Sequence, residues 1–366
     1  MRVLFVLPGL QRINRGAEVA FLEVGEALHE FGHSVTFMGS GPSREGFAPD
    51  YIQVPSISRS AFESFPKMPI FRNEFAYEEL SFLPGLLRAY RPSAYDVTVT
   101  CSYPFVNWVL ARKRENGHRP LHIFVTQNGD WPAFSNASEF RWFHCDGLVC
   151  INPDYYHRNS ESWPCSLIPN GVRLKSFRTD HQSSLIDDDH CKEIRVLMVS
   201  ALSEYKRVLE AIEYLSDDSR IRLTVVGDGP LRADVEDLAR ALLPGRFELL
   251  SVPHSEMPSV YRSHHVFLHM ALDEPFGNVY VEALASGLPI VANSDERVRW
   301  IVGDQNFLAD CCDPGTVLQK VQDAYVMRKR VYQSNLQRSR EYDWELVARK
   351  YECFFQQTLQ RHYHDD

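Results

Sequence analysis

Residues 273–292 read DEPFGNVYVEALASGLPIVA. The apolar run 265–270 just before them predicts a buried strand, and residues 279–286 predict a helix that stops at Gly287. Residues 288–292 predict the next buried strand. A strand that feeds a helix through a glycine turn exposes backbone N–H groups at the positive end of the helix. The stretch therefore predicts an anion-binding turn between a strand and a helix.

Two glutamates lie on either side of this turn, Glu274 in the loop and Glu282 in the first turns of the helix, with seven residues between them. Acidic side chains near a helix start often only complement the helix dipole. Here both carboxylates border a predicted phosphate cradle. That position suits them to bind the hydroxyl groups of a sugar and a ribose.

Strands and helices alternate outward from this stretch in both directions. A strand, a helix and a strand are predicted at residues 2–7, 16–31 and 35–38, and the same order restarts at residues 195–199, 207–215 and 222–226. Such β-α-β units build parallel doubly wound sheets, which bind ligands at the carboxyl ends of their strands. The predicted fold is α/β, with two doubly wound Rossmann-like domains facing each other across a cleft.

Turn residues Ile-Pro-Asn-Gly-Val at 168–172 mark the boundary between the two halves. The predicted domains are an N-terminal domain over 1–168 and a C-terminal domain over 169–340. A last amphipathic helix, in 341–366, is expected to cross back to the first domain. The polar, acidic segment 179–192 is predicted to be a surface loop.

The remaining part of the first half gives two more expectations. Further strands are predicted at residues 96–100, 122–126 and 147–151. The aromatic-rich stretch 56–82 is predicted to be an insertion of loops and short helices near the cleft.

Bulk composition limits the partners of the chain. A formal net charge of -9 over 366 residues argues against nucleic acid as the main partner. No window is long and apolar enough to span a bilayer, and the N-terminus lacks the features of a signal peptide. A local group of basic residues predicts a solvated face or, alternatively, a contact with an anionic membrane or with the acceptor: Arg88, Arg91, Arg112, Lys113, Arg114 and Arg119.

The eight cysteines form no Cys-x-x-Cys pair and match no zinc spacing, and no Asp-x-Asp pair stands at a predicted ligand position. We therefore expect no metal site and no cofactor. Small buried thiols of this kind are typical of a reducing, cytoplasmic compartment.

Phosphate-binding motifs narrow the choice of ligand. Neither Gly-x-Gly-x-x-Gly nor the P-loop motif is present, which disfavours a nicotinamide oxidoreductase and a P-loop NTPase. Gly16 stands at a predicted helix start, where backbone can approach a phosphate or a sugar; a purely structural glycine explains it equally well. Lys206 and Arg207 follow the strand 195–199, where two cations could neutralise a diphosphate leaving group.

With these motifs in place, the chain resembles the retaining glycosyltransferases with two Rossmann-like domains, the GT-B fold, and among them family 4. The resemblance rests on Glu-x7-Glu with an internal Phe-Gly, followed by Glu-Ala-Leu-Ala-Ser-Gly-Leu-Pro-Ile-Val-Ala. Supporting matches are Gly-Ala-Glu at 16–18, Ile-Pro-Asn-Gly-Val at 168–172 and Val-Val-Gly-Asp-Gly-Pro-Leu-Arg at 225–232.

The resemblance implies a role for each matching residue. Glu274 would bind hydroxyls of the donor sugar, Glu282 the ribose hydroxyls and Lys206 the diphosphate, while His254 would lie near the base and Gly16 near the diphosphate or sugar. The diphosphate would also be bound by the backbone amides of Phe276, Gly277, Asn278 and Val279.

Three departures from the family pattern affect these roles. Ala201 stands where an arginine often precedes the lysine, so Arg207 is the candidate replacement. A histidine commonly follows the strand 122–126, where this chain has Thr-Gln-Asn-Gly-Asp-Trp; Gln127 or Asn128 would take its place, with Asp130 nearby. Arg173 replaces the usual acid after the Asn-Gly-Val turn.

The resemblance implies transfer of a hexose from a nucleotide diphosphate sugar, with retention at the anomeric carbon and without a metal ion. UDP-glucose or a related UDP-hexose is the favoured donor, and GDP-mannose is its main rival. A growing exopolysaccharide, another cell-envelope glycan or a lipid-linked saccharide is the expected acceptor, handled in the cytoplasm with a peripheral contact to the membrane. A nucleotide-sugar epimerase and a non-catalytic nucleotide-sugar-binding protein are the alternatives.

Overall fold

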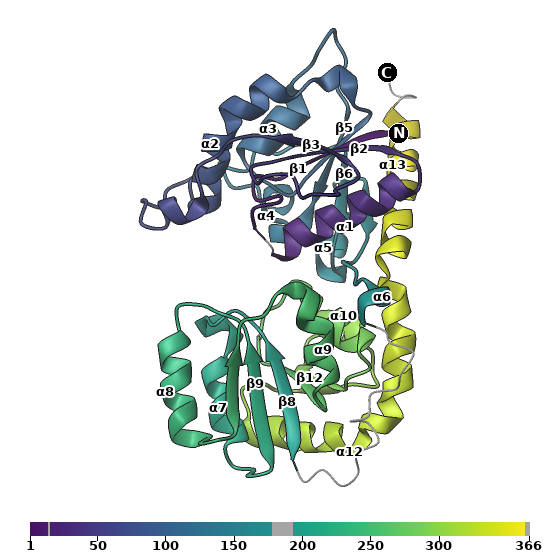
Figure 1. Cartoon of the computed structure of the whole chain (residues 1–366). Helices are drawn as coiled ribbons and strands as arrows, with labels where there is room; N and C mark the ends of the chain where they lie inside the picture. Colours follow the sequence, from purple (N-terminus) through teal and green to yellow (C-terminus); the bar gives the residue numbers. More distant parts are fainter. Residues whose placement is uncertain (14, 178–192, 363–366) are drawn as a thin grey trace. The chain divides into compact units, whose positions relative to one another are not determined.

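The computed structural model describes residues 1–13, 15–177 and 193–362. The chain divides into two compact units: an N-terminal unit, Met1–Asn170 with Trp344–Asp366, and a C-terminal unit, Gly171–Asp343. Each contains one parallel sheet with helices on both faces, so the predicted pair of doubly wound α/β folds is confirmed (Figure 1). The loop predicted at 179–192 lies outside the described residues.

The N-terminal unit has a seven-stranded sheet in the order β3-β2-β1-β4-β5-β6-β7. All its strand pairs are parallel, as buried apolar runs such as Val-Leu-Phe-Val predict. Its strands are β1 Arg2–Val6, β2 Ser34–Gly39, β3 Asp50–Gln53, β4 Val97–Thr100, β5 Leu121–Val125, β6 Gly147–Cys150 and β7 Cys165–Leu167. The two edge strands, β3 and β7, have only four and three residues and gave no clear pattern in the sequence.

Alternate residues of β1 point to opposite faces of this sheet. Leu4 and Val6 pack with the helices α2 and α3, while Phe5 packs against Phe21 of α1. The C-terminal helix α13 contacts α1, so the two helices lie side by side on the same face of the sheet (Figure 1). The helices are α1 Gly16–Glu30, α2 Glu74–Ala89, α3 Phe105–Arg112, α4 Trp131–Phe134, α5 Pro153–Asn159 and α13 Trp344–His362.

The prediction of only loops and short helices over 56–82 is wrong in its second half. There α2 begins at Glu74 and runs for 16 residues. Asn73 caps the helix because its side chain accepts a hydrogen bond from the backbone N–H of Ala76. The aromatic residues that suggested an irregular insertion instead pack on one another, as Phe62, Phe71 and Tyr77 do.

The C-terminal unit has a six-stranded parallel sheet in the order β10-β9-β8-β11-β12-β13. Its strands are β8 Ile194–Val199, β9 Ile221–Val226, β10 Phe247–Leu250, β11 Val266–His269, β12 Ile290–Asn293 and β13 Phe307–Ala309. Its helices are α6 Leu174–Phe177, α7 Val208–Leu215, α8 Arg232–Leu242, α9 Met257–Arg262, α10 Asn278–Ala285, α11 Glu296–Val302 and α12 Pro314–Ser339.

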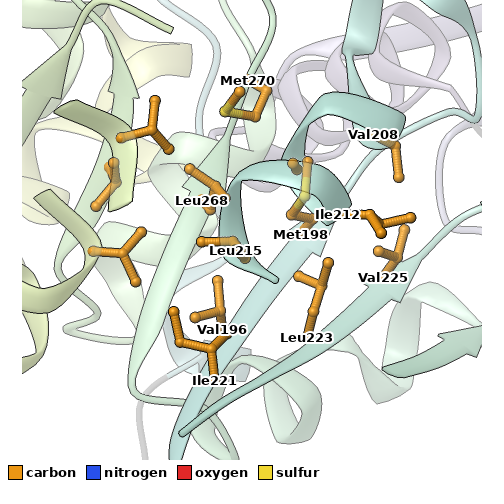
Figure 2. Close-up of a cluster of buried hydrophobic side chains, with 14 of the residues drawn as sticks. Val196, Met198, Val208, Ile212, Leu215, Ile221, Leu223, Val225, Leu268 and Met270 are labelled. Atoms are coloured by element: carbon orange, nitrogen blue, oxygen red, sulfur yellow. The ribbon is translucent and has the colours of Figure 1, made fainter. Parts of the chain in front are cut away.

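One face of this second sheet packs against α7, α8 and α12. Figure 2 shows the core there, with Val196 and Met198 of β8 beside Ile212 and Leu215 of α7. On the other face, Phe267 of β11 contacts Tyr261 of α9 and Tyr280 of α10. Both faces are therefore covered by helices, and the exposed functional groups gather at the ends of the strands.

Candidate functional site

In the C-terminal sheet the chain order reverses between β8 and β11, which are neighbours although β9 and β10 intervene in sequence. Ligands bind at the carboxyl ends of strands at such a point in doubly wound folds. After β8 the chain makes a short 3-10 turn, Glu204–Lys206, and after β11 it enters the loop that carries Glu274. We call the residues gathered here, Lys206, His269, Glu274 and Glu282, the switch-point site.

Lys206 and Glu274 form a direct ion pair at this position. Their side chains are 13% and 14% exposed, so the pair is largely withdrawn from water yet still reachable. Burial raises the pKa of Glu274, but the hydrogen bond from His269 and the ammonium of Lys206 outweigh it and bring the pKa down to about 2. Glu274 is therefore a carboxylate at any physiological pH.

The turn between β11 and α10 requires glycine at position 277. Gly277 has a φ of 75°, and a Cβ there would lie 2.8 Å from the ring of Tyr280 and 2.9 Å from Cγ of Glu274. Gly277 is the N-cap of α10, and no side chain caps this fully described helix start. The backbone N–H groups of the first turn, with the positive helix end, form the predicted anion-binding element.

The predicted anion-binding residues around this turn differ in what their side chains do. Phe276 is 2% exposed and packs against Trp300 and Tyr342. Its ring is thus a core anchor that fixes the turn, and only its backbone can face a ligand. Asn278 and Val279 open the helix and are half-buried.

The carboxylate of Glu282 is engaged on both oxygens. Tyr261, which is fully buried, donates its hydroxyl to Oε2 of Glu282 at 2.8 Å. Burial, together with the charge of Glu282, raises the pKa of the Tyr261 phenol well above its ordinary value, so the phenol stays a donor. Oε1 of Glu282 lies 3.3 Å from Nε2 of His254, whose side chain is 47% exposed. The predicted position of His254 near the base of the nucleotide stays a prediction.

Close backbone packing supports the loop that carries Lys206. A Cβ on Gly227 would lie 1.9 Å from the carbonyl oxygen of Ser200, and one on Gly229 would lie 2.4 Å from that of Leu202. The Gly-Asp-Gly-Pro turn after β9 therefore rests directly on the loop after β8. Leu202 also donates its N–H to the carbonyl of Asp228 at 3.0 Å, which holds the two loops together.

Arg207 does not join Lys206 at the ion pair. It adopts a left-handed conformation, with a φ of 57°, and forms an ion pair with Glu210 at 3.0 Å. Its Nη2 lies 3.4 Å from both the hydroxyl of Tyr214 and the carbonyl of Cys311. This arrangement connects α7 to the loop after β13, and the predicted catalytic role of Arg207 stays a prediction.

The candidates of the N-terminal unit have different surroundings. Asp130 is fully buried and accepts hydrogen bonds from Arg158 at 2.7 Å and from Asn159 at 2.8 Å. Such a carboxylate fixes the loop after β5, which is a structural explanation for its presence. Asn128 is exposed in the same loop, and Gly16 begins α1 at the surface. Their proposed contacts with substrate stay predictions.

Part of the predicted basic face is wrong. Arg119 is turned inward, where its 9% exposed side chain pairs with Asp146 at 2.6 Å. Lys113 donates to the backbone carbonyls of Leu87 and Tyr90, both at 2.8 Å, and so secures the end of α2. Within the described residues no helix is both long and apolar enough to cross a bilayer, and no group of three or more His, Cys, Asp and Glu side chains could hold a metal ion.

Two residues were not predicted: His269 of the switch-point site, and Tyr261, which donates a hydrogen bond to Glu282. His269 ends the apolar strand β11, and a polar residue inside an otherwise apolar run was a signal that could have identified it. Tyr261 lies 21 residues before Glu282 and reaches it only through the packing of α9 on α10. No local pattern in the sequence marks that contact.

Comparison with protein families gives two matches that together take in most of the chain. Residues 14–176 match the family described as Glycosyltransferase Family 4, and residues 178–336 match the family described as Glycosyl transferases group 1. The boundary between the matches falls close to the division of the two units.

Curated relatives with lipid-related names align with the chain at low identity. The alpha-monoglucosyldiacylglycerol synthase of Streptococcus pneumoniae is 25% identical over 70% of this chain and 62% of that protein. Its namesake from Acholeplasma laidlawii is 28% identical over 79% of each chain. The phosphatidylinositol N-acetylglucosaminyltransferase gpi3 subunit of Schizosaccharomyces pombe is 28% identical over 35% of this chain and 28% of that protein. The chain thus spans less than two thirds of the first and third of these relatives.

Solved structures share the fold over nearly the full length. Sucrose-phosphate synthase from Thermosynechococcus elongatus has a TM-score of 0.78 at 17% identity, covering 98% of this chain and 99% of that chain. HepE from Anabaena, solved in complex with UDP and glucose, has a TM-score of 0.71 at 15% identity, covering 96% and 98%. At these identities the likeness shows the fold alone, and that fold is the two-domain GT-B arrangement of α/β units.

Proposed function

The chain belongs to the glycosyltransferases, and we propose that it moves a hexose from a UDP-sugar to a lipid or glycolipid acceptor with retention at the anomeric carbon. One observation carries the proposal. A lysine, two ionised or hydrogen-bonded carboxylates and an uncapped helix start meet at the carboxyl ends of β8 and β11. These are the groups that a diphosphate, a sugar and a ribose require.

Each part of the donor has a counterpart in the switch-point site. The diphosphate would lie against the first turn of α10 and the ammonium of Lys206. Glu282 would accept hydrogen bonds from the ribose hydroxyls, in an orientation that Tyr261 holds. The exposed imidazole of His254 would then face the base side of the nucleotide.

Donor binding requires an exchange of partners. Lys206 is paired with Glu274 in this structure, so the lysine must turn from the carboxylate to the diphosphate when the donor enters. Lys206 then neutralises negative charge on the diphosphate. The carboxylate of Glu274 becomes available to the hydroxyls of the sugar. Lys206 stays paired with an anion, and the carboxylate of Glu274 keeps hydrogen bonds from His269 and the sugar, which matters because a buried charge without partners is costly.

The state of Glu274 supports retention. In an inverting transfer a carboxylate near the reacting carbon takes the proton of the acceptor hydroxyl. In the free protein, with His269 and Lys206 at the carboxylate, the pKa of Glu274 is lowered to about 2, so Glu274 is a weak base in that state. We propose instead that the leaving diphosphate oxygen takes this proton on the same face of the sugar. The protein then contributes positioning and electrostatic stabilisation.

The acceptor is proposed from the relatives rather than from the site. Two of them are named for glucosylation of a diacylglycerol lipid, and the third for transfer of N-acetylglucosamine to phosphatidylinositol. A lipid acceptor would place the reaction at a membrane surface. Because the chain is matched to only part of some of these proteins, a saccharide acceptor is the alternative outcome of the test.

A panel of nucleotide sugars tests the proposal without knowledge of the acceptor. UDP-glucose, UDP-N-acetylglucosamine, UDP-galactose and GDP-mannose are incubated with the protein, and release of UDP or GDP is measured. We expect slow release from a UDP-hexose, faster release when vesicles with diacylglycerol are added, and the same rates in the presence of EDTA. NMR of the product then gives the anomeric configuration. Binding of UDP without release from any donor would favour a non-catalytic binding protein instead.

A further inference from the structure

The side chain of His269 is buried and makes one hydrogen bond to the described residues. It ends β11 and is 1% exposed, with its ring between Phe267 and Tyr280 at centroid distances of 6.4 and 5.1 Å. Its Nε2 lies 3.3 Å from Oε2 of Glu274, while Nδ1 has no hydrogen-bond partner in the described part of the chain. Leaving a buried nitrogen unpaired costs stability, and an apolar residue would fill the same space without that cost.

The geometry fixes what the imidazole does. Burial lowers the pKa of His269 more than Glu274 raises it, so the ring is neutral at neutral pH and carries one proton. Since Glu274 is an acceptor, this proton belongs on Nε2, and Nδ1 is left as the unpaired acceptor. The groups that face the ring are Glu274, the phenol of Tyr280 and, across the carboxylate, Lys206.

The hydrogen bond between His269 and Glu274 matters most when Lys206 is bound to the diphosphate. On the proposed function, Lys206 leaves Glu274 for the diphosphate. The hydrogen bond from His269 is then the contact in the described structure that continues to orient the carboxylate. Its donor comes from a strand end packed on both sides, so it does not move when the lysine does.

We propose that His269 is a positioning residue, which holds the Glu274 carboxylate toward the donor sugar while Lys206 is bound to the diphosphate. This inference rests on the proposed function, and it adds a specificity element to it. His269 orients the group that recognises the sugar and has no contact with the nucleotide.

Two substitutions of His269 distinguish a role in orienting Glu274 from a role in packing alone. His269→Leu keeps the approximate volume and removes the donor, whereas His269→Gln keeps an N–H group near the place of Nε2. Tyr280→Phe is the matched control, because it retains the ring packed on His269 and removes only a hydroxyl without a hydrogen-bond partner in the described chain. The affinity for UDP is measured by calorimetry, and kcat and KM are measured for hydrolysis of UDP-glucose.

We expect His269→Leu to lower kcat/KM for UDP-glucose by about tenfold to hundredfold, as for a lost hydrogen bond to a charged group, while the affinity for UDP changes less than about twofold. His269→Gln should recover most of the loss, and Tyr280→Phe should behave like the wild type. Equal kcat/KM for His269→Leu and wild type, an equal loss of affinity for UDP, or a Gln variant no better than Leu would each overturn the proposal.

A measurement on the wild-type protein guards against variants that do not fold. The ¹⁵N shifts of His269 in histidine-labelled protein report which nitrogen carries the proton. We expect it on Nε2, both free and with UDP bound, and a proton on Nδ1 would overturn the proposal. Failure of the wild type to cleave any nucleotide sugar would instead count against the proposed function, a result that the tautomer does not influence.

Discussion

Two groups of charged side chains occupy comparable places in the two sheets. In the N-terminal unit the group, which we call the Arg59 network, consists of Arg12, Arg59, Glu18 and Glu78. It lies beside Gly9 just after β1, where a Cβ would be 2.2 Å from Oε1 of Glu18. In the C-terminal unit the corresponding place, after β8 and β11, holds the switch-point site.

The two groups differ in how completely they satisfy their own charges. Nη2 of Arg59 contacts Glu18 at 3.3 Å and Glu78 at 3.0 Å, and Arg12 pairs with Glu78 as well. The side chains of Glu18, Glu78 and Arg59 are only 4%, 2% and 10% exposed and that of Arg12 is 23% exposed, so the contrast with the switch-point site lies in the number of charges that are paired. Two cations and two acids thus form a closed set, whereas Lys206 and Glu274 form one reachable pair. The closed set suits a structural role, and the reachable pair can exchange a partner for a ligand.

The largest expected effect is on stability, at the Arg59 network. Arg59→Met should lower the free energy of unfolding by about 3–5 kcal/mol, because two buried carboxylates lose a shared cation. Urea unfolding followed by circular dichroism measures this, with Arg240→Ala at an exposed ion pair as the control that should not change stability. If Arg59→Met is as stable as the wild type but no longer binds UDP-glucose, the assignment of roles to the two groups is wrong.

Removal of the lysine should have its main effect on turnover. Lys206→Ala should lower kcat for donor hydrolysis by about 10²-fold or more, because it removes a fixed positive charge from the leaving diphosphate. Its free energy of unfolding should also fall, but by less than in Arg59→Met, because the largely buried carboxylate of Glu274 loses its cation and keeps the hydrogen bond from His269. Lys175→Ala, at an exposed position in α6 of the same unit, is the control. Normal turnover in Lys206→Ala would remove the lysine from the mechanism.

A smaller effect is expected on nucleotide affinity alone. Glu282→Ala should weaken the binding of UDP by about tenfold to hundredfold, because hydrogen bonds from the ribose to a charged acceptor are lost. Tyr261→Phe should weaken it less, since the carboxylate remains and only its orientation is freed. Calorimetry with UDP and with uracil measures both, and uracil, which has no ribose, should bind the variants and the wild type alike. Unchanged affinity for UDP in Glu282→Ala would exclude the ribose contact.

The same contrast explains which features could be predicted from sequence. Glu274, Gly277 and Glu282 lie within nine residues, and local rules for strands, turns and helix starts were enough to place them together. The position of Lys206 at the site was predicted because it follows the carboxyl end of one predicted strand, 195–199. Their fold, a parallel sheet covered on both faces, followed from buried apolar runs alternating with helices.

Features that depend on distant contacts could not be predicted in this way. Arg59 meets Glu18 across 41 residues of sequence, and no local pattern indicates that pairing. Asp130 was taken as a catalytic candidate because its partner Arg158, 28 residues away, could not be identified beforehand. Arg119 was assigned to a surface patch for the same reason, before its contact with Asp146 was known. The sequence shows that a residue is charged but not which distant residue it pairs with. That partner decides whether the charged residue has a structural or a functional role.

The smallest expected effect is the absence of a pH dependence, and it follows from the charge states at the switch-point site. The pKa of Glu274 is lowered to about 2, so its carboxylate stays charged from pH 7 to 9. The pKa of His269 is lowered from its ordinary value by burial, so the imidazole stays neutral over the same range. Neither group changes its protonation there, and kcat/KM for hydrolysis of UDP-glucose should be constant from pH 7 to 9 within about twofold. A rate that rises with an apparent pKa in this interval would reveal a titrating base, and with it a different mechanism from the one proposed. His269→Gln sharpens the test, because glutamine does not titrate and any pH dependence due to residue 269 would disappear.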